Sequence, residues 1–109
     1  MTMTTIPMFK PDPIDGIAQR VVTDSGPIGA NDQIVLCSHS APITLTLPSG
    51  APDTFFVIIK DFDGVASVNN VLIDCAPSES IDGFDDYTLD VDCMSITIGC
   101  DGSGRYFVV

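Results

Sequence analysis

The single histidine is the first residue to consider for chemistry, because imidazole is the commonest general base and a frequent metal ligand. His39 lies between Ser38 and Ser40 in a stretch typical of a turn. One histidine cannot form a His-based metal cluster. A Ser-His-Asp triad is compatible with the composition, but no G-x-S-x-G elbow is present to position a serine nucleophile. We therefore expect His39 to be a solvated turn residue and the protein not to be an enzyme.

Paired carboxylates are the second candidate. Asp61-x-Asp63-Gly64 and Asp90-x-Asp92 offer oxygen ligands of the kind that Ca²⁺ takes in sets of six to eight. Neither pair continues into the longer D-x-D-x-D-G-x₅-E loop. Calcium in these Asp-rich loops stays open as an alternative, and we expect no metal or other cofactor. A glycosidase pair or a lectin site is formally available, but the chain has no tryptophan to form a sugar platform.

The cysteines Cys37, Cys75, Cys93 and Cys100 contain no C-x-x-C pair, which argues against zinc. The N-terminus lacks the basic region and long apolar core of a signal peptide. We therefore expect folding in a reducing cytoplasm and four buried thiols. A Cys93–Cys100 disulfide would need a geometry that spacing alone does not define.

The net charge limits the classes of partner that the chain could bind. Fifteen acidic and four basic residues give a net charge of −11, which argues against nucleic-acid binding and against an anionic membrane surface. No apolar run approaches the roughly 20 residues of a membrane helix. The mean hydropathy of +0.35 is high for a small soluble monomer. We therefore expect copies or partners to cover part of the apolar surface.

The elements that position these residues are short strands at intervals of about ten residues, bounded by Gly, Pro, Asn and Asp. Residues 43–47 alternate apolar and hydroxyl side chains, and Asp101-Gly-Ser-Gly104 is typical of a hairpin turn. The pattern predicts an all-β fold, a small β-sandwich or jelly-roll-like domain of about eight short strands over residues 19–109. The predicted strands are 19–23, 33–37, 43–47, 54–59, 71–75, 87–91, 94–100 and 105–109, with a brief pairing at 80–82.

Strand 54–59 is apolar on both faces: Phe55, Val57 and Ile59 lie on one, Phe56 and Ile58 on the other. A strand of this kind must be covered twice. Either it is central in a two-layer core, or its second face meets another subunit. We predict that Phe56 and Ile58 form an oligomer interface.

Residues 1–18 predict an extended arm, because Pro7, Pro11, Pro13 and Gly16 interrupt any regular period. The arm is either a terminus without a role or a segment that orders when it docks on a neighbouring protein. Its apolar content is too high for a plain disordered tail. We predict that its five large apolar residues bind a partner: Ile6, Met8, Phe9, Ile14 and Ile17.

Several short stretches resemble a β module common in virion proteins of tailed bacteriophages. They include R-V-V-T at 20–23, D-Q-I-V-L-C at 32–37, I-T-L-T-L-P at 43–48, F-V-I-I-K-D at 56–61 and D-G-S-G-R-Y-F-V-V at 101–109. The resemblance covers about residues 19–109. Arg105-Tyr106-Phe107 stands where such modules commonly carry a tryptophan. The resemblance implies a small β domain of tail fibres, head fibres or capsid decoration proteins, often trimeric and without catalytic residues.

An arm joined to one β domain suits a capsid decoration or cement protein. We expect a non-enzymatic virion structural protein of a tailed bacteriophage, made in the host cytoplasm and carried in the virion. Its expected partners are the major capsid protein and copies of itself in a homotrimer, with no nucleic acid or membrane. The alternative is a tail or fibre-attachment component that binds another tail protein or a host-surface glycan.

Overall fold

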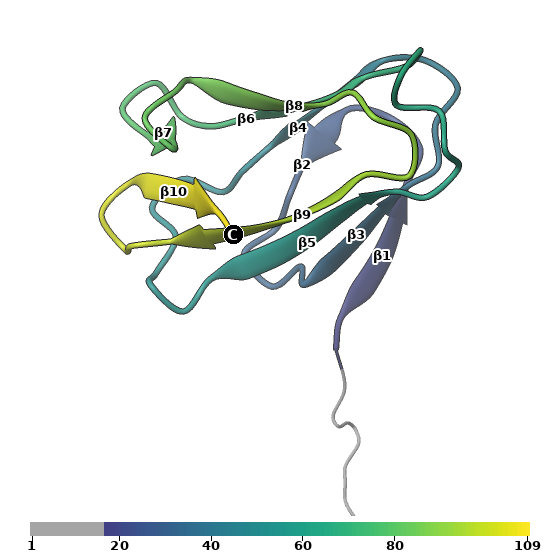
Figure 1. The fold of residues 1–109 in the computed structure, drawn as a ribbon. Coiled ribbons are helices and arrows are strands. Elements are labelled where there is room, and N and C mark those ends of the chain that lie inside the picture. The colour runs from purple at the N-terminus through teal and green to yellow at the C-terminus, as the bar shows by residue number, and fades with distance from the viewer. Residues whose placement is uncertain (1–16) are drawn as a thin grey trace, which may run out of the picture.

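The computed structural model describes residues 17–109, which fold into ten strands in two facing sheets without a helix (Figure 1). The all-β sandwich prediction is confirmed. The strands are β1 (Gln19–Val22), β2 (Gly26–Pro27), β3 (Ile34–Cys37), β4 (Ile43–Thr46), β5 (Phe56–Asp61), β6 (Val71–Asp74), β7 (Ser80–Ile81), β8 (Asp86–Leu89), β9 (Ser95–Cys100) and β10 (Arg105–Val108).

The chain alternates between the two sheets. One sheet has six strands in the order β1-β3-β5-β9-β10-β7, and the other has four in the order β2-β4-β6-β8. The first three strands of each sheet pair in parallel, whereas β9 and β8 join antiparallel to β5 and β6. Parallel neighbours require a crossover between them. Here each crossover is a strand of the opposite sheet, so the first six strands wind around one core (Figure 1).

The core fills the space between the sheets and follows from the alternation of side chains along each strand. In β4, Ile43 and Leu45 are buried, whereas Thr44 and Thr46 point outward. In β5 the buried positions are Val57, Ile59 and Asp61. Burial of each large aliphatic side chain contributes about 1.5–3 kcal/mol, so these inward rows hold the two sheets together.

Two predicted strands differ from the structure by two residues at an end, and the others differ by one. β5 begins at Phe56 rather than at 54, because the Phe55 N–H donates to the Pro52 carbonyl 3.1 Å away and closes a turn. β8 ends at Leu89, and Val91 is 59% exposed. The predicted strand 87–91 therefore extends two residues too far, because the chain has already turned toward β9.

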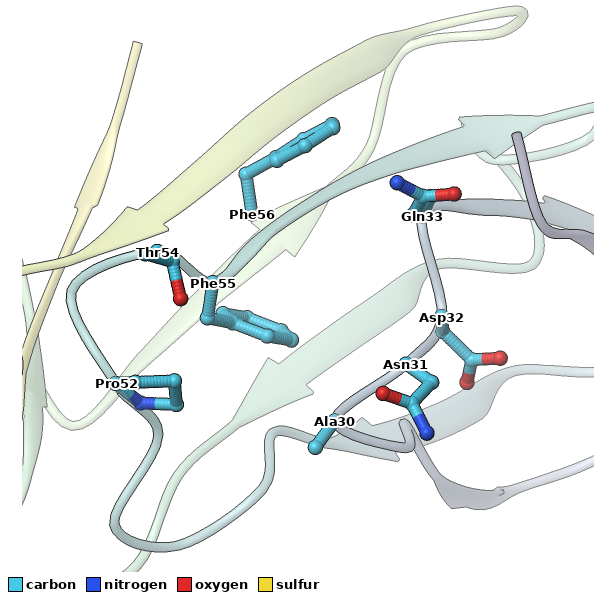
Figure 2. Close-up of a pocket in the computed structure, with 8 residues that line it drawn as sticks. All are labelled: Ala30, Asn31, Asp32, Gln33, Pro52, Thr54, Phe55 and Phe56. Carbon is cyan, nitrogen blue, oxygen red and sulfur yellow. The ribbon is translucent and has the colours of Figure 1, made fainter. Parts of the chain in front are cut away.

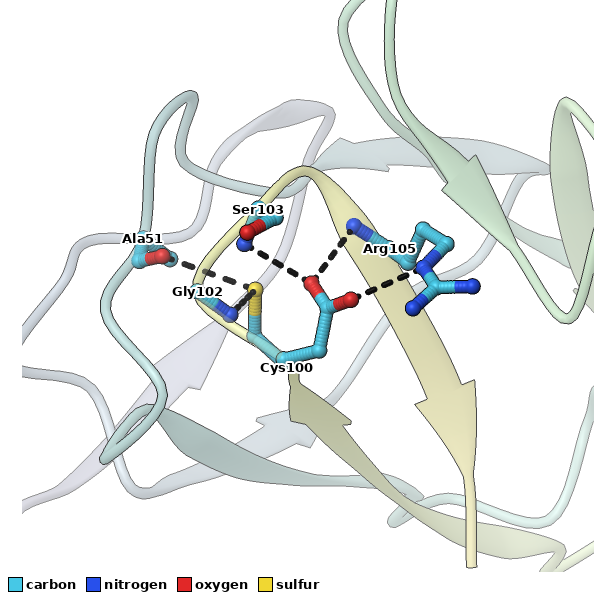
Figure 3. Close-up of polar contacts among 6 residues, drawn as sticks. Ala51, Cys100, Gly102, Ser103 and Arg105 are labelled. Carbon is cyan, nitrogen blue, oxygen red and sulfur yellow. Dashed lines mark hydrogen bonds and ion pairs between the residues drawn. The ribbon is translucent and has the colours of Figure 1, made fainter.

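The predicted hairpin at residues 101–104 is confirmed and joins β9 to β10 (Figure 3). The Asp101 carboxylate accepts the backbone N–H groups of Ser103 (2.8 Å) and Arg105 (3.1 Å), and it also accepts the Nε–H of Arg105 at 2.8 Å. Gly102 and Gly104 have φ values of +83° and +87°, which side chains with a Cβ rarely adopt. The turn therefore requires both glycines and the aspartate.

Candidate interaction surface

His39 joins two loops of the fold. Its side chain is buried, and its Nε2 lies 2.8 Å from the Asn69 carbonyl oxygen. The prediction of a solvated turn residue is wrong, because the β3–β4 loop packs against the β5–β6 loop and the imidazole joins them. Sequence alone gives no signal for a contact between residues thirty positions apart.

The two carboxylates at the end of β5 also hold loops. Asp61 is fully buried, and its Oδ2 accepts the N–H groups of Ala66 (2.8 Å) and Cys93 (3.0 Å). Asp63 accepts the hydroxyl of Ser38 at 2.8 Å. Within residues 17–109, no three His, Cys, Asp or Glu side chains are grouped so that they could hold a metal ion.

All four cysteines are free thiols, and three of them are buried. Burial, with a contribution from nearby Asp61, raises the pKa of the Cys37 thiol to about 11. Cys100 donates toward the Ala51 carbonyl 3.5 Å away (Figure 3). The prediction that Cys93 is buried is wrong: it lies exposed in the loop before β9, outside the space between the sheets.

The most distinctive surface is the outward side of the six-stranded sheet, which we call the apolar outer face. Register aligns its residues into rows across five strands. None is acidic, although the chain carries fifteen carboxylates. Two acidic residues border the face: Asp101 in the β9–β10 turn and Asp82 after β7, and both line a pocket with Arg105 and Phe107. The apolar outer face comprises Gln19, Val21, Ile34, Leu36, Phe56, Ile58, Lys60, Ser95, Thr97, Gly99, Arg105 and Phe107.

Two partly exposed aromatic rings lie in one row of this face. Gly99 of β9 pairs with Phe56 of β5 on one side and with Phe107 of β10 on the other. A Cβ on Gly99 would lie 2.7 Å from the Phe107 ring, so only glycine leaves room for it. Phe56 is 42% exposed and Phe107 is 40% exposed. Exposed aromatic pairs of this kind are typical anchors of protein interfaces.

The predicted site residues fall into three groups. Phe56 and Ile58 both lie on the apolar outer face. Ile17 is 68% exposed and comes just before β1. The other four predicted partner-binding residues, Ile6, Met8, Phe9 and Ile14, lie outside the described residues. Val21, Ile34, Leu36 and Phe107 were missed, although Ile34-Val35-Leu36-Cys37 is apolar on both faces in the same way as residues 54–59.

A groove of about 410 Å³ opens where Phe56 begins β5 (Figure 2). At its edge, Asp32 accepts Arg20 Nη2 and the Gly29 N–H, both at 2.8 Å. The hydrogen bond from Arg20 holds the pKa of the Asp32 carboxyl below its usual range. The lining residues are Ala30, Asn31, Asp32, Gln33, Pro52, Thr54, Phe55 and Phe56.

Comparisons with known proteins assign no family to the chain. Neither family models nor curated proteins gave a match. In the part of the chain that the structure describes, no helix has the length and hydrophobicity needed to cross a membrane. The functional argument therefore depends on the apolar outer face and on the residue pattern of the strands.

Proposed function

We propose that the chain is a non-enzymatic virion structural protein of a tailed bacteriophage, a capsid decoration or cement protein that binds the head shell as a homotrimer. The observation that carries this proposal is the apolar outer face. In a chain of net charge −11, five neighbouring strands expose aliphatic and aromatic residues without one carboxylate. The resemblance of the strand motifs to phage virion modules supports the same role.

Charge explains why association would use this face. Copies of a strongly acidic protein repel one another across most of their surface. Lys60 and Arg105 are half of the chain's basic residues, and both belong to the apolar outer face, where Arg105 is paired with Asp101. Electrostatic repulsion between copies is therefore weakest at the face whose burial gives the largest hydrophobic stabilisation. We assign Phe56 and Ile58 to the contact between copies.

The size of the face indicates that it does not act alone. Five strands about 4.8 Å apart and up to six residues long cover roughly 500 Å² of flat area. A standard stable interface takes about 800 Å² from each partner. We therefore propose that the arm supplies the contact with the major capsid protein through Ile6, Met8 and Phe9, with Ile14 and Ile17 closer to the domain. Pro7, Pro11 and Pro13 restrict the free arm and so reduce the entropy lost when it docks.

The test of the anchor compares capsid binding by three forms of the chain. Deletion should stop at residue 16, because the Ala18 N–H donates to Gln33 Oε1 at 2.7 Å. We expect co-sedimentation with capsids to be lost on deletion of residues 1–16 and in the triple variant I6S/M8S/F9S. The control T2S/T4S/T5S should bind as the unchanged chain does. Unchanged occupancy by the deleted chain would show that the arm is not the anchor.

Electron microscopy of virions assembled with and without the protein distinguishes the two functional candidates. Density lost from the head supports the decoration role. Density lost from the tail would overturn it in favour of a tail or fibre-attachment component, and a glycan array would then test binding to host-surface glycans.

A further inference from the structure

We propose that the groove in Figure 2 seats the proline-rich segment of the chain's own arm, residues Pro11–Ile14. Binding in the groove would fix the direction in which the remaining arm residues leave the domain. The inference goes beyond the proposed function and concerns the isolated protein. It relies on that function only for its consequence, the presentation of Ile6, Met8 and Phe9 to a partner.

The groove has two firm walls. One is the loop of residues 30–33 that leads into β3, and the other is the loop of residues 52–55 that leads into β5 (Figure 2). The Phe55 ring is buried and packs edge-on against Tyr106, with ring centroids 6.0 Å apart. Phe56 adds a second, partly exposed ring at the rim. Phe55 is only 5% exposed, so Phe56 offers most of the aromatic surface that a proline ring could contact. Proline-rich segments in the polyproline II conformation typically pack on exposed aromatic rings.

The arm joins the domain beside this groove. Ala18 donates its N–H to the Gln33 side chain, and its carbonyl accepts the N–H of Ile34 at 3.0 Å. Gln33 itself lines the groove. Residues 11–14 precede Ala18 by four to seven positions, a reach of roughly 13–23 Å for an extended chain. The segment is therefore long enough to turn back onto the groove.

The chemistry of the two partners matches. Proline has no N–H, so a proline-rich segment presents carbonyl oxygens that need donors and rings that pack on aromatic faces. Gln33 uses its side-chain oxygen for Ala18, and Figure 2 shows its amide nitrogen on the side of Phe56. Asn31 and Thr54 add an amide and a hydroxyl along the same groove. The groove thus offers hydrogen-bond donors along its walls and the Phe56 ring at its rim.

A short connection favours the chain's own arm over a free peptide. Two sites joined by a few residues meet at an effective concentration in the millimolar range. An intrinsic affinity too weak to capture a separate peptide is then sufficient. This consideration leads us to assign the groove to the arm of the same copy rather than to that of a neighbour.

The test is nuclear magnetic resonance of the full, isotopically labelled chain. We expect nuclear Overhauser contacts from the rings of Pro11 and Pro13 to the aromatic protons of Phe55 and Phe56. The amide order parameters of Asp12 and Ile14 should be near 0.8, against values below about 0.6 for a flexible segment. The groove-filling variants A30W and T54W should lose the contacts and lower these order parameters. S49W, an equal addition at an exposed residue outside the groove, should retain both.

Two results would overturn the inference. One is an unchanged chain with no arm-to-groove contacts and order parameters below about 0.6 for Asp12 and Ile14. The other comes from a mixture of labelled and unlabelled chains: contacts seen only between different chains would assign the groove to a neighbour's arm. Because no capsid is present in either measurement, a failure of capsid binding with these contacts intact would count against the proposed function alone.

Discussion

The two sheets share one core, but their outer surfaces differ in composition. The outward residues of the four-stranded sheet are hydroxyl or acidic with two exceptions, Pro27 and Leu72; the others are Thr44, Thr46, Asp74, Asp86 and Thr88. The apolar outer face of the six-stranded sheet has no carboxylate and centres on Phe56 and Phe107. Because the inner rows of both sheets are equally buried, the difference does not come from folding. It is the basis of our proposal that one sheet faces solvent and the other faces a partner.

The charges of the four-stranded sheet reinforce this difference. Asp74 of β6 lies directly opposite Asp86 of β8 in the register. Like charges in this position repel and destabilise the pair. Burial first, and then Asp74 and its acidic neighbours, raise the pKa of the nearby Cys75 thiol. A surface that tolerates internal repulsion is poorly suited to meet a second acidic chain.

The largest expected effect is a difference in stability loss between substitutions on the two faces of β5. Ile59 points into the core and its neighbour Ile58 points out of it. Ile59→Ala should lower the free energy of unfolding by about 2–5 kcal/mol, the usual loss for a buried isoleucine. Ile58→Ala should cost less than half of that in the monomer, because its side chain is only partly buried. Urea denaturation of both variants under monomeric conditions measures the difference, and equal losses would contradict the assignment of faces.

Thiol labelling tests whether the core is shared by both sheets. Cys37 belongs to the six-stranded sheet and Cys75 follows β6 of the other, and both are buried. Native alkylation followed by mass spectrometry should label exposed Cys93 first. Labelling of Cys37 and Cys75 should be on the order of a hundredfold slower, because it needs an opening that costs several kcal/mol. All four should react in denaturant without a reductant, and an unlabelled pair would reveal a disulfide.

The free energy of unfolding should depend modestly on pH through the Arg20–Asp32 pair at the edge of the six-stranded sheet. Hydrogen bonding to Arg20 lowers the pKa of Asp32 in the folded state. The pair therefore contributes its full stability above the unfolded pKa of about 4 and loses it as the pH falls through the lower folded value. Because Arg20 is partly exposed, the contribution should be at most about 1 kcal/mol.

A comparison of the unchanged chain with the Asp32→Asn variant isolates the contribution of the Arg20–Asp32 pair to the free energy of unfolding. The variant should be less stable than the unchanged chain at pH 6, and the gap should close near pH 2. Asp24→Asn, a change at an exposed aspartate in the loop after β1, controls for net charge. A gap that persists undiminished at pH 2 would show that the carboxylate's charge is not the cause.

The smallest expected effect is a gain in the free energy of unfolding. Asp86→Asn removes the repulsion from Asp74 and should stabilise the domain by about 0.2–0.5 kcal/mol. The gain should shrink in 1 M salt, where screening shortens the range of charge interactions. Asp90→Asn, which changes the same net charge at an exposed position after β8, is the matched control. An equal gain in both variants would assign the effect to net charge rather than to the cross-strand pair.

Local patterns predicted every strand except β2, together with the faces of most side chains. Alternation places Ile43 and Leu45 inward, and the glycines of residues 101–104 define the last hairpin. The same patterns do not specify which strands become neighbours, because an alternating strand buries the same side chains against a parallel or an antiparallel partner. The crossover winding of β1 to β6 therefore had no signal in the sequence.

The candidate surface was predicted in part for the same reason. Phe56 and Ile58 stand out because their strand is apolar on both faces. Phe107 and Val21 join them only through a register that aligns residues from both ends of the chain. His39, Asp61 and Cys93 were misjudged or left open because contacts between distant loops decide their burial.

The most direct test of the account is the oligomeric state of the full chain by multi-angle light scattering at micromolar concentration. We predict a trimer that F56D and I58D convert to a monomer, because each places three carboxylates in a closed apolar interface. T44D and T88D, which add the same charge to the four-stranded sheet, should remain trimeric. A monomer for the unchanged chain, or equal dissociation in all four variants, would contradict the claim that the apolar outer face joins the copies.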